Sequence, residues 1–348
     1  MSSLWNSFDS KKILVTGHTG FVGAWICLVL AHFGCDITGF SLPEEKGSLY
    51  EKIHGKLNIK SVYGNLCDKD CITEVVNNLK PDIVFHIAAF GFVKECMENP
   101  ERAFATNVQG TLNLFEAIKT IGKPCKIIVA SSDKVYQNSD LDTCLFTEED
   151  SLGGLDPYSA SKTCEDLLVR GYFDSYLMKQ NCMLSVIRPS NILGGGDHNM
   201  NRLIPSIYFS FSNGSLPEIR NPDSVRPWQN IFDIVDVYIT VAEAFDEGCH
   251  VYNVGPEPAG IKSVGEIVSY VSHLYSKDCV VPKTEQSSLK EMKYLGLSID
   301  KIKIELNWKP KRNLEQTLKE IYYFYNNDNG KNTYDLCMEQ IMNYYEED

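Results

Sequence analysis

The sequence predicts an α/β fold, a doubly wound parallel sheet with helices on both faces. Two observations support this prediction. Short apolar segments alternate with longer helical patterns from residue 11 to residue 189, which is typical of strand–helix–strand units. A glycine-rich turn joins the first apolar segment to the first helical pattern, the place where sheets of this class bind phosphate groups.

The glycine-rich turn follows the apolar strand Ile13–Val15 and leads into a helix that begins near Gly20. Gly17 permits a tight bend, Gly20 lets the backbone approach a pyrophosphate, and Gly23 lets the helix pack closely on the strand. The position between strand and helix favours a dinucleotide-binding turn, and a sheet of the Rossmann type, over an ordinary glycine-containing turn. The turn residues expected at the cofactor are Gly17, His18, Thr19, Gly20, Phe21, Val22 and Gly23.

Further strands and helices alternate along the chain. Asp68 is expected to cap one helix, and Asp156 with Pro157 to start another, because Asp favours the N-cap and Pro the first helical position. The predicted strands lie at 36–40, within 61–68, and at 81–89, 126–130, 183–187 and 251–254. The predicted helices begin at Asp68 and Pro157 or span 103–121, 231–245, 264–274, 314–325 and 334–345.

Glycine and proline residues interrupt this alternation after Ser190, so a second, smaller region is expected to be interleaved with the first. We predict an NAD-binding Rossmann domain from residues 1–189 with 231–255, and a substrate-binding domain from 190–230 with 256–325. Residues 326–348 are expected to form a linker and an appended helix with an acidic end, to which we assign no function.

Composition limits the classes of function. The chain has 348 residues and a net charge of −13, which argues against nucleic acid or an anionic membrane as the main partner. Its twelve cysteines include no C-x-x-C pair, so we expect reduced thiols of a cytoplasmic protein and no metal site. The N-terminal residues lack a signal pattern, and the apolar runs are too short to span a bilayer.

Other positions favour a cofactor at the carboxyl ends of the strands. The second strand ends at Ser41, with Glu44 nearby and no arginine, which favours the ribose hydroxyls of NAD over the 2′-phosphate of NADP. The small residues Ala88 and Ala89 leave room for a cofactor, although tight packing would explain them equally well. Further candidate cofactor contacts are Asn65, Leu66 and Asn107.

Tyr158 and Lys162 are four residues apart on one predicted helix, and they therefore share one of its faces. A lysine ammonium close to a phenol favours the phenolate, which lowers the pKa of the tyrosine toward working pH. Taken alone, the pair would be an ordinary surface feature. Together with the glycine turn and Ser132 after the fifth strand, it resembles the extended short-chain dehydrogenase/reductase family that acts on nucleotide sugars.

The residues after Ser132 narrow this resemblance. Asp133 and Lys134 resemble the motif of the CDP-glucose 4,6-dehydratase group, whereas related epimerases carry small or uncharged residues there. A solvated turn is the alternative explanation for this charged pair. The resemblance extends over residues 11–325, with matching stretches at 16–21, 151–158, 191–197, 202–205 and 219–229.

The resemblance implies a reaction with a bound NAD. Tyr158 would take the C4 hydroxyl proton of the sugar as NAD takes hydride, with Ser132 bonded to the oxygen and Lys162 tuning the phenol. The C4 ketone makes the C5 proton acidic, so Lys134, if neutral when it acts, would remove that proton while Asp133 protonates the departing C6 hydroxyl. Hydride return to C6 then gives a 4-keto-6-deoxy sugar for polysaccharide synthesis. Asp133 must hold a proton near neutral pH, which requires a desolvated pocket.

Arginines stand out in this acidic chain, since from Arg188 to Arg226 there are four arginines and no lysine. Guanidinium groups suit the paired oxygens of a diphosphate, although each arginine alone could serve surface solubility. Arg188 resembles the family's residue beside the nicotinamide, and is thus a candidate cofactor contact. The predicted contacts to a nucleotide-diphosphate sugar are Asn191, Arg202, Arg220 and Arg226.

The chain departs from the family pattern at three places. The family has Lys at Val22, His at Asn230 and a different run at Phe90–Lys94, and the last change bears on the choice of sugar. The alternatives to a dehydratase are a nucleotide-sugar 4-epimerase, which does not need the acid–base pair, and a non-catalytic NAD-binding sensor or scaffold. The resemblance also implies a homodimer formed through the helices at 103–121 and 158–178.

Overall fold

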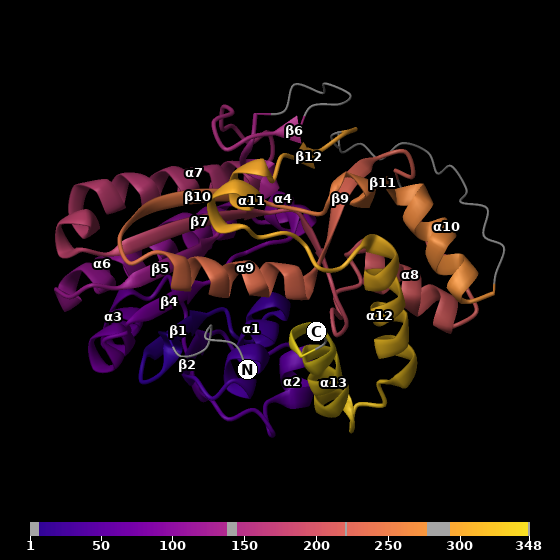
Figure 1. Cartoon of the computed structure of the whole chain (residues 1–348), viewed down its shortest axis with the longest axis horizontal. Coiled ribbons are helices and arrows are strands. Elements are labelled where there is room, and N and C mark those ends of the chain that lie inside the picture. Colours follow the sequence, from indigo (N-terminus) through magenta and orange to yellow (C-terminus); the bar gives the residue numbers. More distant parts are fainter. Residues whose placement is uncertain (1–6, 138–144, 220, 277–292, 347–348) are drawn as a thin grey trace.

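A seven-stranded parallel sheet forms the centre of the molecule in the computed structural model, which describes residues 7–137, 145–219, 221–276 and 293–346 (Figure 1). The strand order is β10-β7-β5-β4-β1-β2-β3, so the chain winds outward from β1 in both directions. This arrangement confirms the predicted fold class. The strands are β1 (Lys12–Thr16), β2 (Asp36–Ser41), β3 (Lys60–Tyr63), β4 (Ile83–His86), β5 (Lys126–Ala130), β7 (Met183–Pro189) and β10 (Gly248–Val254).

Helices cover both faces of the sheet, and the alternation of side chains along β1 explains why. Ile13 and Val15 point into one apolar cluster, whereas Leu14 between them points into the other. The first cluster is closed by α1 (Phe21–His32), α9 (Ile231–Ala244), α2 (Leu49–Ile53) and α13 (Thr333–Tyr345). The second is closed by α3 (Lys69–Leu79), α6 (Thr111–Ile121) and α7 (Pro157–Tyr172).

The predicted helix starts at Asp68 and Asp156 are confirmed. The Asp68 carboxylate accepts from the backbone N–H of Cys71, and Asp156 accepts from that of Ser159, with Pro157 in the first turn of α7. The helix predicted at 103–121 begins earlier and is not uniform. It comprises α5 (Pro100–Phe104), a π-helical segment at Ala105–Gly110, and α6.

A smaller group of elements adjoins the carboxyl ends of the large sheet. A three-stranded sheet in the order β11-β9-β8 packs with three helices, which lie together at one end of the molecule (Figure 1). Two further short strands, β6 (Leu145–Phe146) and β12 (Gly296–Leu297), pair in parallel with each other. The strands are β8 (Asn191–Leu193), β9 (Val225–Asn230) and β11 (Ile261–Ser263), and the helices are α8 (Leu203–Ser212), α10 (Val264–Leu274) and α12 (Leu314–Asn327). Short helices α4 (Val93–Glu98) and α11 (Asp300–Leu306) complete the fold.

The helix predicted at 334–345 is present as α13, and it is part of the core. It packs against α1 and α2, and Tyr344 donates a hydrogen bond of 2.7 Å to the Asp233 carboxylate on α9. The last helix described therefore covers the first helix of the chain.

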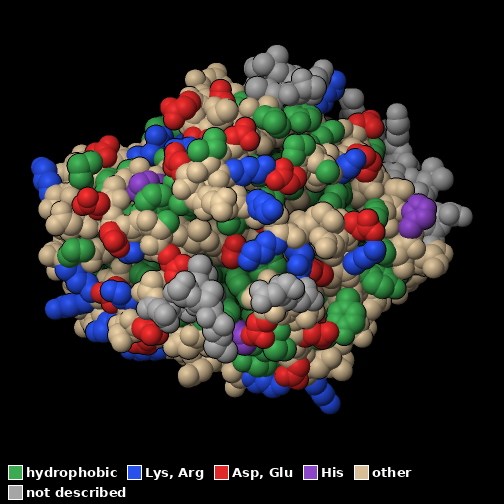
Figure 2. Space-filling model, viewed as in Figure 1, with side chains coloured by type: hydrophobic (Ala, Val, Ile, Leu, Met, Phe, Trp, Pro, Cys, Tyr) green, Lys and Arg blue, Asp and Glu red, His purple; other side chains and the backbone are tan. Residues whose placement is uncertain are grey.

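The surface mixes charges of both signs. On the face shown in Figure 2, acidic and basic side chains are interspersed, with no large area of a single sign. Over the described residues, no helix combines the length and apolar character needed to cross a membrane.

Candidate active site

The candidate site lies where β1, β4 and β5 end, because most of the predicted residues directly follow these strands. Thr16 ends β1 and precedes the glycine turn, His86 ends β4 shortly before Ala88 and Ala89, and Ala130 ends β5 two residues before Ser132. Open parallel sheets bind ligands at this edge.

The glycine turn has the geometry of a phosphate cradle. Gly17 has a φ of +77°, and a Cβ there would lie 2.7 Å from the backbone of Ala88. A Cβ at Gly23 would overlap the Gly17 carbonyl, so α1 packs directly on the turn. Gly20 at the N-cap supplies no side chain to the first N–H groups of α1, which are therefore suited to a pyrophosphate.

The turn is fixed to its neighbours by polar side chains. The Thr19 hydroxyl lies 2.8 Å from that of Ser41 at the end of β2. Nε2 of His18 lies 3.2 Å from the Ser61 hydroxyl on β3, and burial lowers the pKa of His18 to about 4, which keeps its ring neutral. Phe21 and Val22 are the first residues of α1, where they are half-buried.

The other candidate cofactor residues have structural partners of their own. Asn65 accepts a hydrogen bond of 3.0 Å from the backbone N–H of Cys67, and Leu66 is buried. The Asn107 amide accepts from the Phe90 N–H at 2.7 Å and donates to the Ser161 hydroxyl at 2.9 Å. Asn107, which lies in the π-helical segment, therefore links the segment after β4 to α7.

Four of the five candidate catalytic residues meet above the end of β5. Ser132, Asp133 and Lys134 form a tight turn, in which the Ser132 hydroxyl donates to the Asp133 carboxylate at 3.2 Å. The Lys134 ammonium lies 5.9 Å from the centre of the Tyr158 ring. Burial raises the pKa of Tyr158, while a hydrogen bond with Ser132 opposes that shift. The first turn of α7 thus brings the phenol to the residues after β5.

Asp133 occupies the desolvated pocket that its proposed role requires. Its side chain is 3% exposed, and among the described residues its Oδ2 has no hydrogen-bond partner. Burial raises the pKa of Asp133 to about 6, against the opposing charges of Lys134 and Arg226. A carboxyl group with this pKa is partly protonated near neutral pH and can donate a proton.

Lys162, the fifth candidate, lies one turn deeper in α7. Its ammonium donates to the carbonyl oxygen of Ala130 at 2.7 Å and forms an ion pair with the buried Glu165. Glu165 was not among the predicted site residues, although its spacing of three residues from Lys162 places it on the same side of the helix.

Three of the four predicted substrate residues lie in the adjoining small sheet or beside it, namely Asn191 on β8, Arg226 on β9 and Arg202 at the N-cap of α8. Nη1 of Arg202 donates to Asp197 at 2.9 Å, and its guanidinium lies 4.9 Å from the centre of the Phe92 ring. Nη1 of Arg226 on β9 donates to the Val225 carbonyl at 2.8 Å. Asn191 on β8 pairs in register with Trp228 on β9. Arg220 lies outside the described residues.

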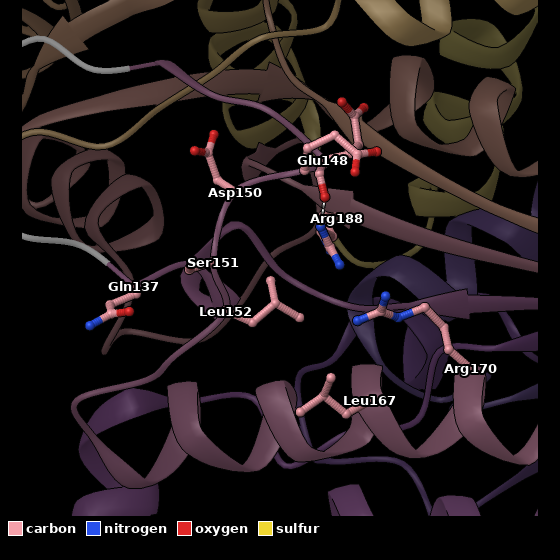
Figure 3. Close-up of a pocket in the computed structure, with 9 residues that line it drawn as sticks. Gln137, Glu148, Asp150, Ser151, Leu152, Leu167, Arg170 and Arg188 are labelled. Carbon is pink, nitrogen blue, oxygen red and sulfur yellow. Dashed lines mark hydrogen bonds between the residues drawn. The ribbon is translucent and has the colours of Figure 1, made fainter.

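Arg188 is committed to protein partners. Its guanidinium donates to both Asp166 oxygens at 2.9 Å and to the Tyr136 hydroxyl at 2.9 Å. Figure 3 shows it beside Glu148 and Arg170 in a separate pocket. Arg188 therefore holds β7 to α7, and its contact with a cofactor stays a prediction.

Two of the departures from the family pattern have local explanations. Asn230 caps α9 by accepting from the Phe232 N–H at 2.8 Å, and it donates to Glu320 at 2.9 Å. Phe90 is buried under the Arg102 guanidinium, which lies 4.4 Å from the ring centre. Across the described ranges, no group of three His, Cys, Asp or Glu side chains could hold a metal ion.

The parallel sheet, the glycine cradle and the group of Ser132, Tyr158 and Lys162 define an extended short-chain dehydrogenase/reductase. A sequence model of the family described as GDP-mannose 4,6 dehydratase matches residues 14–321. The chain belongs to this family.

Individual relatives agree with this assignment. The chain is 34% identical to a CDP-glucose 4,6-dehydratase of Salmonella typhimurium over 329 residues, which cover 91% of this chain and 90% of the relative. A solved dTDP-glucose 4,6-dehydratase of Bacillus anthracis in complex with NAD has a TM-score of 0.78 and 25% identity, and the match covers 92% of this chain and 98% of that one. A UDP-glucose 4-epimerase of Thermotoga maritima has a TM-score of 0.80 at 20% identity over 90% and 98% of the two chains, which shows the shared fold alone.

Proposed function

We propose that this protein dehydrates a nucleotide-activated hexose across C5 and C6, that the substrate is CDP-glucose, and that the product is CDP-4-keto-6-deoxyglucose. The observation that carries the proposal is the acid–base pair Asp133 and Lys134 beside Tyr158. A 4-epimerase needs the phenol but has no use for a buried, partly protonated carboxyl group. The identity with a CDP-glucose 4,6-dehydratase supports the choice of nucleotide.

The cofactor of this reaction would be NAD, held by the glycine turn and the end of β2. The close backbone approach at Gly17 and the uncapped start of α1 fit a pyrophosphate, and the absence of arginine at residues 41–45 fits an unphosphorylated ribose. The chemistry that bound NAD supplies is removal of hydride from C4 and its return at C6.

The side chains then move the protons. Tyr158 accepts the C4 hydroxyl proton, and Ser132 donates a hydrogen bond to the oxygen as the ketone forms. Lys134, as the neutral amine, removes the C5 proton, which the neighbouring carbonyl makes acidic, while Asp133 protonates the C6 hydroxyl so that it leaves as water. The ammonium formed on Lys134 then returns a proton to C5 in the last step. The guanidinium groups of Arg202 and Arg226 would bind the diphosphate, with Asn191 beside them.

The proposal extends to domains and assembly. We infer that residues 1–189 with 231–255 bind NAD and that 190–230 with 256–325 bind the sugar nucleotide. A homodimer through α6 and α7 is supported by apolar side chains left exposed on and after α7, with Leu167 53% and Met178 52% exposed. Sedimentation that finds only monomer would remove this part. A cytoplasmic location and a role in polysaccharide synthesis rest on the reduced cysteines and on the family.

The function is tested by incubating the protein with CDP-, dTDP-, GDP- and UDP-hexoses. We expect a product from CDP-glucose that has lost one water, shows the ultraviolet absorbance of a 4-keto sugar, and carries hydrogen label from C4 on its C6 methyl group. An epimer without loss of water would establish the epimerase. Binding of NAD with no turnover of any hexose would establish the sensor or scaffold.

A further inference from the structure

Glu165 forms a buried ion pair with Lys162, and the proposed reaction gives Glu165 no role. The side chain of Lys162 is 2% exposed and that of Glu165 is 1% exposed. Burying two charges is costly, and a hydrophobic residue of similar size would often serve packing better. The pair therefore calls for an explanation in terms of the chemistry of Lys162.

Glu165 is held in place from two other elements. The Thr111 hydroxyl of α6 donates to its Oε1 at 3.3 Å, and Nε2 of His86 on β4 lies 3.7 Å from the same oxygen. Burial and the charge of Lys162 lower the pKa of His86 to about 3, so His86 faces Glu165 as a neutral ring. The neighbouring Asp166 adds negative charge. Burial raises the pKa of Glu165, and the positive charge of Lys162 opposes that shift and favours the carboxylate.

The charge of Glu165 also reaches the phenol. Burial raises the pKa of Tyr158, and the charges of Asp133 and Glu165 raise it further, while the hydrogen bond with Ser132 and the charge of Arg202 lower it. Lys134 faces the ring from the turn after β5. A carboxylate in contact with an ammonium weakens the field of that ammonium at a third group.

We propose that Glu165 is a positioning residue which, by pairing with Lys162, limits how strongly the lysine stabilises the Tyr158 phenolate. This inference rests on the proposed function, in which Tyr158 is the base, and on the tuning of its phenol by Lys162 that the family resemblance implies. Glu165 thereby fixes the ammonium against the Ala130 carbonyl and sets the pH at which the phenol becomes a base. Glu165 changes only the acidity of the Tyr158 hydroxyl, and it accepts no group during the reaction.

The test measures the ionisation of residue 158 directly. Tyr158 is replaced by a difluorotyrosine, whose lower intrinsic pKa brings the phenol into a measurable range, and the protein with bound NAD is titrated by ¹⁹F NMR. In Glu165→Gln we expect the midpoint to fall by about one pH unit, a tenfold change in proton concentration. The acid limb of the pH profile for C4 oxidation should move in the same direction.

A double-mutant cycle tests whether the effect of Glu165 depends on the charge of Lys162. In a Lys162→Met background the unpaired, buried Glu165 takes up a proton, so adding Glu165→Gln should leave the midpoint unchanged. A shift of equal size in both backgrounds would overturn the proposal, as would an unchanged or raised midpoint in the single variant. If Glu165→Gln does not fold, Glu165→Asp replaces it, and a smaller downward shift is expected.

The control is an exposed pair of the same kind. Glu315 on α12 accepts from Lys319 at 2.7 Å in solvent, and Glu315→Gln should leave the midpoint where it is. No sugar is present in the titration, so its outcome is independent of the substrate. Failure of every hexose in the turnover assay would refute the proposed function, while the NMR midpoint would still report on Glu165.

Discussion

The side-chain nitrogen of Lys134 faces the Tyr158 ring, with 5.9 Å between the nitrogen and the ring centre. The proposed base for C5 is thus beside the phenol that acts at C4, and these two carbons are neighbours in a hexose. One bound sugar can therefore meet both groups without moving between steps. Because different side chains serve C4 oxidation and C5 deprotonation, the two steps can be measured separately in single variants.

Replacing Lys134 should stop the reaction after the first step. In Lys134→Met the ammonium is lost but the stem remains, so C4 oxidation continues and the reduced cofactor accumulates. We expect overall turnover to fall by about 10²–10⁴-fold and deuterium exchange at C5 to disappear. Stopped-flow absorbance and mass spectrometry check both. Lys319→Met on the exposed face of α12 is the control, and retained C5 exchange in Lys134→Met would contradict the role.

The elimination step should depend on pH through Asp133. Because burial raises the pKa of Asp133 to about 6, its acid form prevails below that pH and is lost above it. Where elimination limits the rate, turnover should fall about tenfold per pH unit above this range. Asp133→Asn should abolish elimination and leave C4 oxidation measurable. A variant that releases 4-keto-6-deoxy sugar at the parent rate would exclude Asp133 as the acid.

The same substitution should stabilise the fold. A carboxyl group with a raised pKa disfavours the folded state once the pH exceeds its unfolded value near 4, and the penalty is complete above about 6. Asp133→Asn should therefore raise the free energy of unfolding at pH 8 by at most about 3 kcal/mol, with no gain below pH 4. Urea unfolding at the two pH values checks this. An equal gain in the free energy of unfolding at both pH values would show that burial of the Asp133 charge is not the cause of the stabilisation.

Arg202 should affect binding more than chemistry. Its guanidinium is held by Asp197 and lies 4.9 Å from the centre of the Phe92 ring and 5.8 Å from that of Phe21. Loss of a charge-assisted contact to a diphosphate costs about 1.5–3 kcal/mol, so Arg202→Ala should raise KM by about 10–100-fold with kcat within a few-fold. Steady-state kinetics provide the measurement, and Arg202→Lys should recover part of the loss. An unchanged KM would remove Arg202 from the substrate site.

The pair of Asp166 and Arg188 should be structural. Both groups are buried and joined by two hydrogen bonds of 2.9 Å, so Asp166→Asn leaves an uncompensated guanidinium and should cost about 3–5 kcal/mol of stability. The double variant Asp166→Asn with Arg188→Met should be more stable than the sum of the single variants implies. Thermal unfolding of the four proteins measures this, and strict additivity would contradict the pairing.

Much of the fold could be predicted from the sequence because its signals are local. The apolar runs that became β1, β4, β5 and β7 are short, continuous and separated by helical patterns, and capping residues such as Asp68 and Asp156 mark helix starts without reference to distant parts. Strands of two or three residues, such as β6 and β12, give no such signal. Their pairing joins residues 145–146 to 296–297, and only tertiary packing decides it.

In the candidate site too, some features follow from local sequence and others depend on tertiary packing. Spacing was enough to bring Ser132, Asp133 and Lys134 into one turn and Tyr158 onto the start of α7. It could not show that the Arg188 guanidinium would be taken up by Asp166, because that depends on how β7 and α7 pack. The spacing of Glu165 from Lys162 could have predicted that the two share a side of the helix. Its burial beside Thr111 and His86 could not be predicted, because those residues belong to two other elements.

The closing of α1 by α13 has a consequence for biosynthesis. The apolar side of α1 emerges from the ribosome early, whereas α9 and α13, which cover it, and the edge strand β10 are made hundreds of residues later. The nascent chain therefore presents bare hydrophobic surface for most of its translation. Shelter of that surface by chaperones, until α9 and α13 have been made, would thus favour correct folding of the nascent chain.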